Sequence, residues 1–260
     1  MKKGKKLYEG KAKIVFATID KNVVIQHFKD DATAFNNQKI AIIEGKGILN
    51  NRISEHILKS LSEIGIKNHL IKRLNMREQL VELVNIIPIE FIIRNIATGS
   101  LSKRLGIEEG TVLDYPLIEY CLKNDDLGDP IVSREHILNF KWLNKIELNQ
   151  INEQCLRIND FLQGLFRGIG IKLVDFKVEF GKAKSDEKII LADEISPDNC
   201  RLWDQETEKK LDKDRFRKDL GNVVEAYQEV ARSLGILHEQ SNIRPIKFPK
   251  PTAVKIKKNK

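Results

Sequence analysis

The sequence predicts an α+β protein, because its strands come in groups that helices separate. Strand-like segments dominate the first third of the 260 residues, and the remainder mixes helices with strands. Regular strand–helix alternation, which would predict a doubly wound parallel sheet, is not seen. We therefore expect two lobes with a cleft between them: a β-rich N-terminal lobe, residues 1–87, and a mixed lobe, residues 88–260.

Apolar segments predict the strands of the first lobe and the start of the second. A run of ten residues, IIPIEFIIRN, predicts a strand that continues past Pro88. The other strand-like segments are residues 7–16, 23–28, 67–74 and 80–87.

Three helices are expected from apolar periodicity and from the residues at their ends. One covers residues 50–64, where Asn50 or Asn51 caps the start and Gly65 ends it. A long amphipathic helix covers residues 145–166. The third begins at Asp212 or Asp214 and runs to Leu234 before Gly235, and a basic tail with Pro245, Pro249 and Pro251 follows it.

The segment VDFKVEFG is the most regular strand pattern in the chain. Asp175, Lys177 and Glu179 alternate with an apolar set, namely Val174, Phe176, Val178 and Phe180. Side chains alternate between the two faces of a strand, so one face can enter a core while the other presents two carboxylates and an ammonium group. The pattern is equally that of an ordinary solvated strand.

A second apolar run, residues 189–192, follows a polar turn and leads into more acids, among them Asp193, Glu194 and Asp198. A hairpin whose strands end in carboxylates can hold a magnesium–nucleotide. Asp193 shares a face with Ile189 and Leu191, so whether it meets Glu179 depends on a register that the sequence does not fix.

Composition limits the classes of function. The net charge of +8 comes largely from lysines at both ends, and aromatic residues are 7% of the chain, which disfavours nucleic-acid binding. Three separated cysteines without a CxxC motif indicate a reducing compartment and argue against a zinc site. No apolar leader or membrane-spanning run is apparent, so we expect a cytoplasmic protein that does not bind membranes.

Three further segments could bind anions. Glu9 to Lys13 places a glycine and two lysines in a strand, and Gly45-Lys46-Gly47 precedes a helix start. Arg94 ends a strand before Gly99 and Ser100, where Ser100 can cap a short helix that Gly106 ends. Each segment also has a plain structural interpretation, as a charged bend, a connector or a capped helix.

Seven segments together resemble the signature blocks of the SAICAR synthetase family, in the same order. They span residues 7 to 221 and read LYEGKAKIVF, FKDDATAFN, GKGILNNRIS, PIEFIIRNIATGSLSKRLGIEEG, LVDFKVEFG, DEISPDNCRLWD and DKDRFRKDLG. The family joins the carboxylate of the ribonucleotide CAIR to the amino group of L-aspartate, with ATP and magnesium, in purine biosynthesis. The resemblance implies a two-lobed ATP-binding architecture similar to the ATP-grasp and protein-kinase folds.

The resemblance also implies roles for individual residues. Glu179 and Asp193 would hold magnesium, and Lys177 and Asp198 would lie at the reacting groups. Arg94, Ser100 and Arg201 would bind the phosphate and carboxylate of the ribonucleotide. The nucleotide would be bound by Gly10, Lys11, Ala12, Lys13 and Val15, with Ile86 and Ile87 in a segment, Ile86–Pro88, that lines the adenine cleft.

The implied chemistry is phosphoryl transfer to a carboxylate, followed by attack of an amine on the acyl phosphate, with cations stabilising the transferring group. No activated Ser, Cys or His is needed, and none of the five histidines has metal-ligand spacing. A small-molecule kinase of related fold is the nearest alternative, and a non-catalytic basic RNA-binding module is another. Bacterial relatives imply a homodimer.

Overall fold

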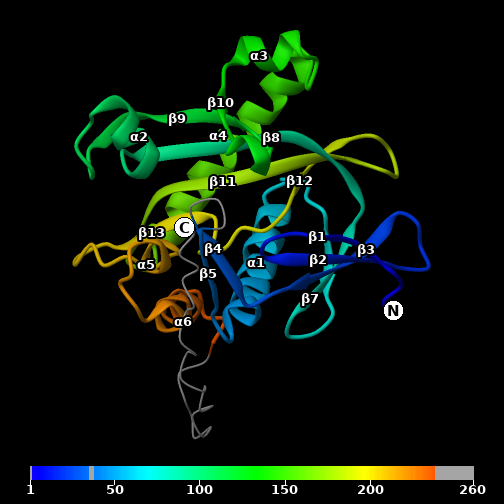
Figure 1. Cartoon of the computed structure of the whole chain (residues 1–260), viewed down its shortest axis with the longest axis horizontal. Coiled ribbons are helices and arrows are strands. Elements are labelled where there is room, and N and C mark those ends of the chain that lie inside the picture. Colours follow the sequence, from blue (N-terminus) through cyan, green and yellow to red (C-terminus); the bar gives the residue numbers. More distant parts are fainter. Residues whose placement is uncertain (1, 35–37, 238–260) are drawn as a thin grey trace, which may run out of the picture.

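The computed structural model describes residues 2–34 and 38–237. Two antiparallel sheets form its main layers, with helices packed between and around them (Figure 1). The predicted proline-containing tail and Phe35 and Asn36 of the FKDDATAFN segment lie outside the described residues. None of the described helices is long and apolar enough to cross a membrane.

The first sheet has five strands in the order β1-β2-β3-β7-β6. Its strands are β1 (Lys6–Glu9), β2 (Lys13–Ala17), β3 (Val23–Phe28), β6 (Leu70–Arg73) and β7 (Glu78–Glu82). The segment LYEGKAKIVF is therefore a hairpin and not one strand, because Gly10 N–H donates to the Lys13 carbonyl at 2.8 Å and turns the chain. A separate pair, β4 (Asp31–Ala34) and β5 (Lys39–Ile42), follows β3.

The second sheet is built on two long strands, β8 (Val84–Ile96) and β11 (Ile171–Ala183), which pair along most of their length. The order is β10-β9-β8-β11-β12, and β13 also pairs with β11. The remaining strands are β9 (Val112–Leu122), β10 (Ile131–Val132), β12 (Ile189–Ala192) and β13 (Cys200–Asp204).

The helices are α1 (Lys46–Glu63), α2 (Gly99–Leu105), α3 (Arg134–Asn139), α4 (Lys145–Arg167), α5 (Asp214–Arg217) and α6 (Val223–Ser233), with a 3₁₀ turn at Asp125–Leu127. The expected helix 145–166 is confirmed as α4. Its start is fixed by a capping box, in which Asn144 accepts from the Glu147 backbone and Glu147 accepts from the Asn144 backbone.

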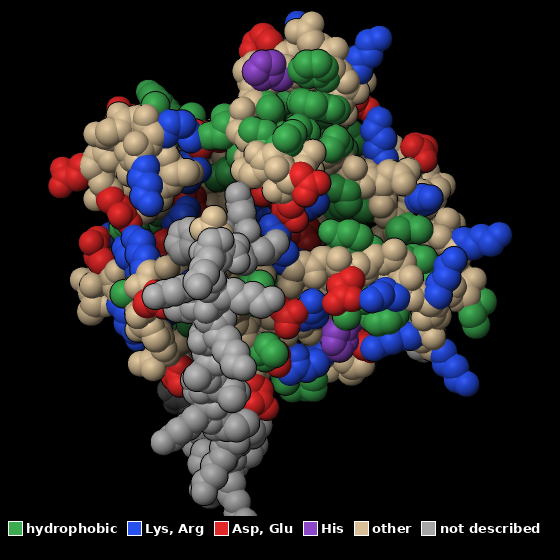
Figure 2. Space-filling view, in the orientation of Figure 1, with side chains coloured by type: hydrophobic (Ala, Val, Ile, Leu, Met, Phe, Trp, Pro, Cys, Tyr) green, Lys and Arg blue, Asp and Glu red, His purple; other side chains and the backbone are tan. Residues whose placement is uncertain are grey.

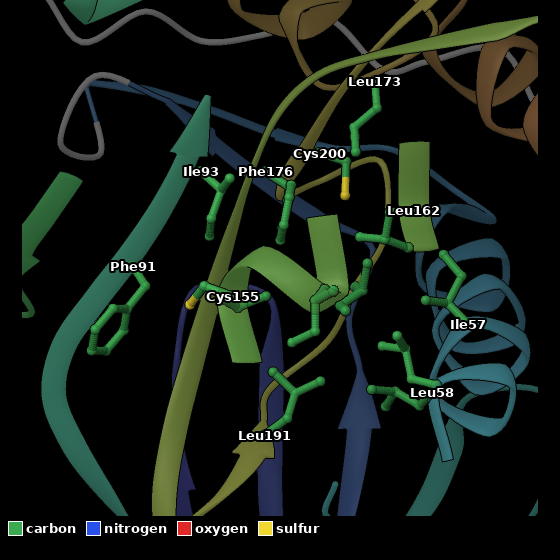
Figure 3. Close-up of a cluster of buried hydrophobic side chains, with 14 of the residues drawn as sticks. Ile57, Leu58, Phe91, Ile93, Cys155, Leu162, Leu173, Phe176, Leu191 and Cys200 are labelled. Carbon is green, nitrogen blue, oxygen red and sulfur yellow. The ribbon is translucent and has the colours of Figure 1, made fainter. Parts of the chain in front are cut away.

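The main hydrophobic core lies between the second sheet and the helices, chiefly α1, α4 and α6. Figure 3 shows Ile57 and Leu58 of α1 near Leu162 of α4, Phe176 of β11 and Leu191 of β12. Helix α1 also packs on β3, β6 and β7 of the first sheet and on α6. The α+β architecture is confirmed, and α1 connects the first sheet to the core of the second.

The change from the first sheet to the second occurs at Leu83, between β7 and β8. The predicted lobe boundary between residues 87 and 88 therefore falls inside β8. Pro88 does not end the strand, because β8 pairs with β11 on both sides of it. The division into two lobes stays a prediction, and Leu83 is the position where the chain crosses.

Two expected helices differ from the structure. Helix α1 begins at Lys46, since Gly45 (φ 87°) turns the chain there, and Asn50 and Asn51 are buried inside the helix and do not cap it. The expected helix 214–234 is interrupted: α5 ends at Arg217, and Asp219, Gly221 and Asn222 adopt positive φ before α6 starts. Residues 218–222, with the sequence KDLGN, form this turn.

The alternation along β11 holds from Asp175 onward but not before it. A register shift between Leu173 and Asp175 in the pairing with β13 moves Val174 out of line. Phe176, Val178 and Phe180 enter the main core, whereas Val174 packs with Ile96 and Trp203 in a small cluster. The expectation that Val174 shares the core face with Phe176 is thus wrong.

Helix α2 is not capped by Ser100. Thr98 is the N-cap residue, and the Ser100 hydroxyl accepts a hydrogen bond from Arg94 Nη2 at 3.1 Å. Gly106 ends the helix in the left-handed conformation, as expected. The Ser100 hydroxyl therefore binds Arg94 in the cleft and does not cap the helix.

Replacing two helical glycines with alanine should change the free energy of unfolding in opposite directions. A Cβ at Gly47 would lie 2.6 Å from the Phe28 carbonyl oxygen and 2.8 Å from that of Lys29, whereas a Cβ at Gly164 in α4 meets nothing within 4 Å. We expect Gly47→Ala to lower the free energy of unfolding by about 2 kcal/mol. Gly164→Ala should raise it by about 0.5–1 kcal/mol, the usual helix preference.

Urea unfolding of both variants, followed by circular dichroism, measures these changes. Gly164→Ala serves as the matched control for the substitution itself. A Gly47→Ala protein at least as stable as the parent would mean that α1 does not press against the end of β3.

Candidate active site

A cleft of about 790 Å³ lies between the two sheets. The β1–β2 turn lines one side, β8 and β11 line the other, and the segment 193–201 lies at the base. Acidic and basic side chains gather in the hollow (Figure 2). The cleft is therefore highly charged. Apolar side chains of β2, β3 and β8 also line it, namely Val15, Val24 and Ile86.

The pairing of β8 with β11 forms the charged wall. Glu90 lies opposite Glu179 and Arg94 lies opposite Asp175, with Lys177 between them along β11. Directly opposite residues of antiparallel strands point to the same face, so all five side chains face the cleft. The sequence predicted the β11 half of this row, and the pairing supplies the β8 half.

Asp193 reaches the cleft through a local change of backbone. In the β11–β12 register Ala192 is opposite Glu179, so a regular strand would send Asp193 to the other face. Asp193 instead has φ 61°, a left-handed conformation that Asp tolerates better than most residues. Its carboxylate pairs with Lys13 and lies close enough to Glu179 for its charge to act on that residue, in the direction that raises the pKa of Glu179.

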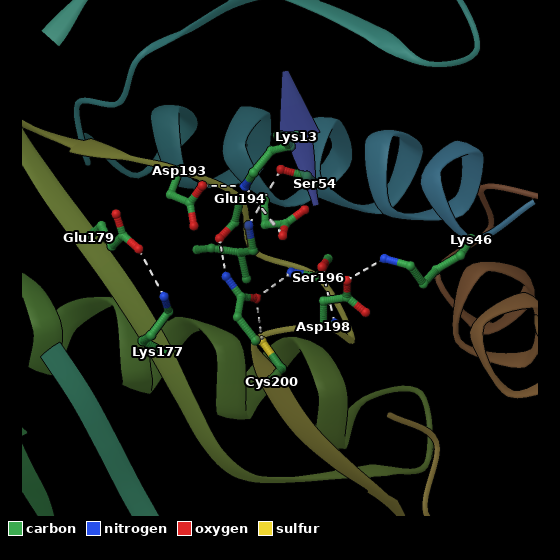
Figure 4. A network of polar contacts seen from close by, with 12 residues as sticks. Lys13, Lys46, Ser54, Lys177, Glu179, Asp193, Glu194, Ser196, Asp198 and Cys200 are labelled. Atoms are coloured by element: carbon green, nitrogen blue, oxygen red, sulfur yellow. Dashed lines mark hydrogen bonds and ion pairs between the residues drawn. The ribbon is translucent and has the colours of Figure 1, made fainter. Parts of the chain in front are cut away.

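Lysines from three elements neutralise these acids. Lys177 Nζ lies 2.5 Å from Glu90 Oε1 and 2.8 Å from Glu179 Oε1, and Lys123 Nζ lies 2.7 Å from Glu179 Oε1. Lys13 Nζ contacts Asp193 and lies 3.3 Å from Glu194 Oε1. Figure 4 shows part of this network: Lys13 near Asp193 and Glu194 of the segment after β12, and Lys177 beside Glu179 on β11.

Burial and charge oppose each other in this network. Burial raises the pKa of Glu179, but the ammonium groups of Lys177 and Lys123 outweigh it and the pKa is lowered. For Glu90, burial outweighs Lys177 and the pKa is raised. Burial lowers the pKa of Lys177, and Glu179 and Glu90 reverse this and raise it well above its usual value. Lys177 therefore stays charged.

A second cluster holds two arginines around Asp175. Arg94 Nη1 and Arg201 Nη1 donate to Asp175 Oδ2 at 2.9 and 2.7 Å, and Arg94 is only 2% exposed. Glu119 binds Arg94 Nε at 2.6 Å, and Asp214 binds Arg201 Nε at 3.0 Å. The carboxylates hold the guanidinium groups in fixed orientations, which suits recognition of an anion.

Asp198 is tied into the protein from two sides. Lys46 Nζ lies 2.6 Å from Asp198 Oδ2, and Tyr227 OH donates to Asp198 Oδ1 at 2.6 Å. Burial raises the pKa of Asp198, and Lys46 and Lys213 lower it further than burial raises it, so the carboxylate is ionised. Lys46 is paired with Asp198 and does not line the cleft. The interpretation of Gly45-Lys46-Gly47 as an anion site is therefore wrong.

Most of the predicted site residues line the one cleft, namely Gly10, Lys11, Ala12, Lys13, Val15, Ile86, Arg94, Ser100, Lys177, Glu179, Asp193, Asp198 and Arg201. Ile87 does not: it is 4% exposed and belongs to the core. Alternation along β8 turns Ile86 and Pro88 toward the cleft and Ile87 away from it. Lys11 is at the rim, where its Nζ lies 2.6 Å from Asp125 Oδ1.

Sequence reasoning missed several charged or polar residues of the cleft, among them Glu90, Lys123, His69, Lys213 and Arg217. Glu90 was within reach, because it is four residues before Arg94 in a predicted strand and so shares its face. Lys123 and Lys213 follow no pattern. His69 is buried beside Lys13 and Asp193, and burial lowers its pKa to about 4, which keeps it neutral.

The donor set fits a magnesium–nucleotide without forming a complete metal cage. Within residues 2–34 and 38–237, no three His, Cys, Asp or Glu side chains are grouped to hold a metal ion. Magnesium bound with a nucleotide needs only one or two carboxylates, since phosphates and waters complete its octahedron. Glu179 and Asp193, close together and both ionised, provide that pair.

Comparison with known proteins identifies the family. The SAICAR synthetase family model matches residues 6–234. The chain belongs to the SAICAR synthetase family. The phosphoribosylaminoimidazole-succinocarboxamide synthase of Pelagibacter ubique is 68% identical over 260 residues, covering 99% of this chain and 100% of that protein.

Solved structures agree with this membership. The crystal structure of phosphoribosylaminoimidazole-succinocarboxamide synthase from Ehrlichia chaffeensis is 57% identical with a TM-score of 0.89, covering 90% of this chain and all of that one. A SAICAR synthetase in complex with ADP is 43% identical with a TM-score of 0.86, covering 90% of this chain and 99% of that one. The fold expected from the family resemblance is thereby confirmed.

The Tyr227 hydroxyl should contribute measurably to stability. Tyr227→Phe leaves a buried carboxylate with Lys46 alone, and we expect the free energy of unfolding at pH 7 to fall by about 2–3 kcal/mol. The pKa of Asp198 is depressed in the folded state, so its contribution is present above its ordinary value of 3.8 and is lost as the pH falls below it. The difference in unfolding free energy between the parent and Tyr227→Phe should therefore become smaller below pH 3.8.

Tyr120→Phe is the matched control for this substitution. Tyr120 OH pairs with the neutral amide of Asn152 in a half-buried setting, so its loss should cost about 1 kcal/mol and show no such narrowing. Equal costs for the two variants would argue against an ionised Asp198. Urea titrations at pH 7 and at about pH 3, below the ordinary pKa of Asp198, provide the comparison.

Proposed function

We propose that the cleft carries out the ligation typical of the family by way of magnesium-bound ATP and an acyl phosphate. Members of this family join CAIR to L-aspartate in an ATP-dependent reaction of purine biosynthesis, and the chain is a ligase of this kind. The observation that carries the proposal is the row of Arg94, Glu90, Asp175, Lys177 and Glu179 across two paired strands. It places cations for an anionic substrate next to carboxylates for a metal.

The nucleotide would lie between the β1–β2 turn and the start of β8. Val15, Val24 and Ile86 offer apolar contacts there, and Lys11 and Lys13 lie beside the turn at Gly10. A Cβ at Gly10 would crowd the ring of Tyr8 at 3.1 Å, so the small residue keeps the turn close to the cleft. The SAICAR synthetase complex with ADP supports nucleotide binding in this fold.

Glu179 and Asp193 would hold magnesium, which would neutralise charge on the triphosphate. Glu90, Glu179, Asp193 and Glu194 face Lys13, Lys123 and Lys177, so this part of the wall carries more negative than positive groups before any ligand binds. A divalent cation relieves that excess. The lysines can then turn toward the transferring phosphoryl group.

The steps follow from the chemistry of carboxylates. A carboxylate is a poor acyl donor, because its leaving group would be oxide. Transfer of the γ-phosphoryl group to the CAIR carboxylate releases ADP and forms an acyl phosphate. The amine of L-aspartate attacks the acyl carbon, the C–N bond forms, the C–O bond to phosphate breaks, and the amine loses a proton. Lys177 and Lys13 would stabilise the charge on the phosphoryl oxygens.

Arg94, Arg201 and Ser100 would bind the ribonucleotide at the far end of β8. Their preset orientation by Asp175, Glu119 and Asp214 reduces the ordering cost of binding. We also propose that the protein is a cytoplasmic homodimer, and sedimentation velocity tests the dimeric state.

Removing the charge of Glu179 should abolish most activity without unfolding the protein. Glu179→Gln keeps the size and loses the metal ligand, so we expect ATP-dependent turnover to fall roughly 100-fold or more. Steady-state ADP formation with CAIR and L-aspartate measures the effect. Near-normal turnover of a folded variant would remove Glu179 from the metal site.

Glu109→Gln is the control, since Glu109 pairs with Lys218 on the surface and does not line the cleft. Its turnover should stay within about twofold, the usual range for a surface change of up to 0.5 kcal/mol.

The parent protein distinguishes a ligase from a kinase. ADP formation should require both CAIR and L-aspartate, and ADP formed at full rate without the amine would favour the kinase.

A further inference from the structure

The cleft contains a cation without a carboxylate partner. Within the described ranges, each of the other Lys and Arg side chains that line the cleft lies within 4 Å of an acid, whereas Lys213 Nζ has no ion pair and no hydrogen bond. Lys213 is half-buried. Partial burial of a charged ammonium group costs free energy unless an anion binds to it.

The backbone fixes where Lys213 stands. Its N–H donates to the Pro197 carbonyl at 3.0 Å, and its own carbonyl accepts from Phe216 and Arg217 at 3.0 Å each. The residue thus joins the start of α5 to the loop that carries Asp198. Burial lowers the pKa of Lys213 to about 8, with Asp198 raising it and Arg217 and Lys46 lowering it.

Arg217 adds further donors on the same side. Its Nη1 donates to Asp214 Oδ1 at 2.6 Å, and the rest of its fork has N–H groups to spare. Arg217 lies one helical turn after Lys213, and both line the cleft. Two cationic side chains, one at the N-cap of α5 and one in its last turn, therefore line the cleft within electrostatic range of each other.

Asp198 decides which class of anion fits. It is ionised and lies in the electrostatic range of Lys213. A phosphate monoester bound at Lys213 would be repelled by Asp198 and Asp214. An amino acid has a carboxylate for the lysine and an amino group whose N–H can donate to Asp198, each of whose oxygens accepts one hydrogen bond already and retains a lone pair.

We propose that Lys213 and Arg217 bind a carboxylate of the amino-acid substrate, L-aspartate, with Asp198 accepting from its amino group. This inference rests on the proposed function and assigns the part of the cleft that receives the amine. It also separates the two anionic substrates, because the ribonucleotide would stay on Arg94, Arg201 and Ser100. Lys46 and Tyr227 then act as positioning residues for Asp198.

Steady-state kinetics of Lys213→Met test the assignment. We expect the KM for L-aspartate to rise at least tenfold, the size expected for a lost hydrogen bond to a charged group. The KM values for CAIR and ATP should stay within about threefold. Lys213→Arg, which keeps the charge, should recover part of the affinity for L-aspartate. Lys218→Met, on the exposed side of the same segment, is the control and should change none of the three.

The outcomes separate the two hypotheses. If the parent protein does not ligate CAIR and L-aspartate, the proposed function fails. If the parent is active and Lys213→Met raises the KM for CAIR instead, the site holds the ribonucleotide phosphate and the inference is overturned. Unchanged KM values overturn it as well. Should Lys213→Met fail to fold, the same kinetics on Lys213→Gln decide the question.

Discussion

The pairing of β8 with β11 is the interaction on which the cleft depends. It is the longest strand pair of the second sheet, and its register decides which side chains meet. Because opposite residues share a face, one register gives both a hydrophobic side packed on α4 and a polar side open to ligands. A shift of β11 by one residue would exchange the two faces of that strand and place Lys177 and Glu179 in the core.

Charge balance along this wall is local rather than global. The acids at the β12 end outnumber their lysines, while the Arg94 and Arg201 end presents fixed guanidinium groups. The net charge of +8 is therefore a poor guide to function, since much of it comes from the ends of the chain, whereas nearly every cation of the cleft is paired with an acid. A cleft that carries both signs of charge suits a reaction that brings polyanions and a metal together.

Sequence reasoning predicted what depends on local patterning. The period of two along β11 indicated that Asp175, Lys177 and Glu179 share a face, and the apolar stripe of α4 gave its bounds closely. It could not predict what depends on distant pairing. The partner of Glu179 across the strands, the burial of Lys46 against Asp198 and the left-handed turn at Asp193 all require the register or the packing of segments far apart in the chain. Val174 was misplaced for the same reason. The position of Ile87, in contrast, follows from the alternation along β8, which turns neighbouring side chains to opposite faces.

The segment before β6 joins the two sheets beneath the cleft. His69 N–H donates to the Leu191 carbonyl, Leu191 N–H donates to the Lys67 carbonyl, and the side chain of Leu191 is fully buried in the core that α1 shares. Opening the lobes widely would break these bonds and expose that core. Ligand exchange therefore has to use small movements at the rim, such as the β1–β2 turn. In native-state hydrogen exchange, the amides of His69 and Leu191 would open only when the whole molecule unfolds.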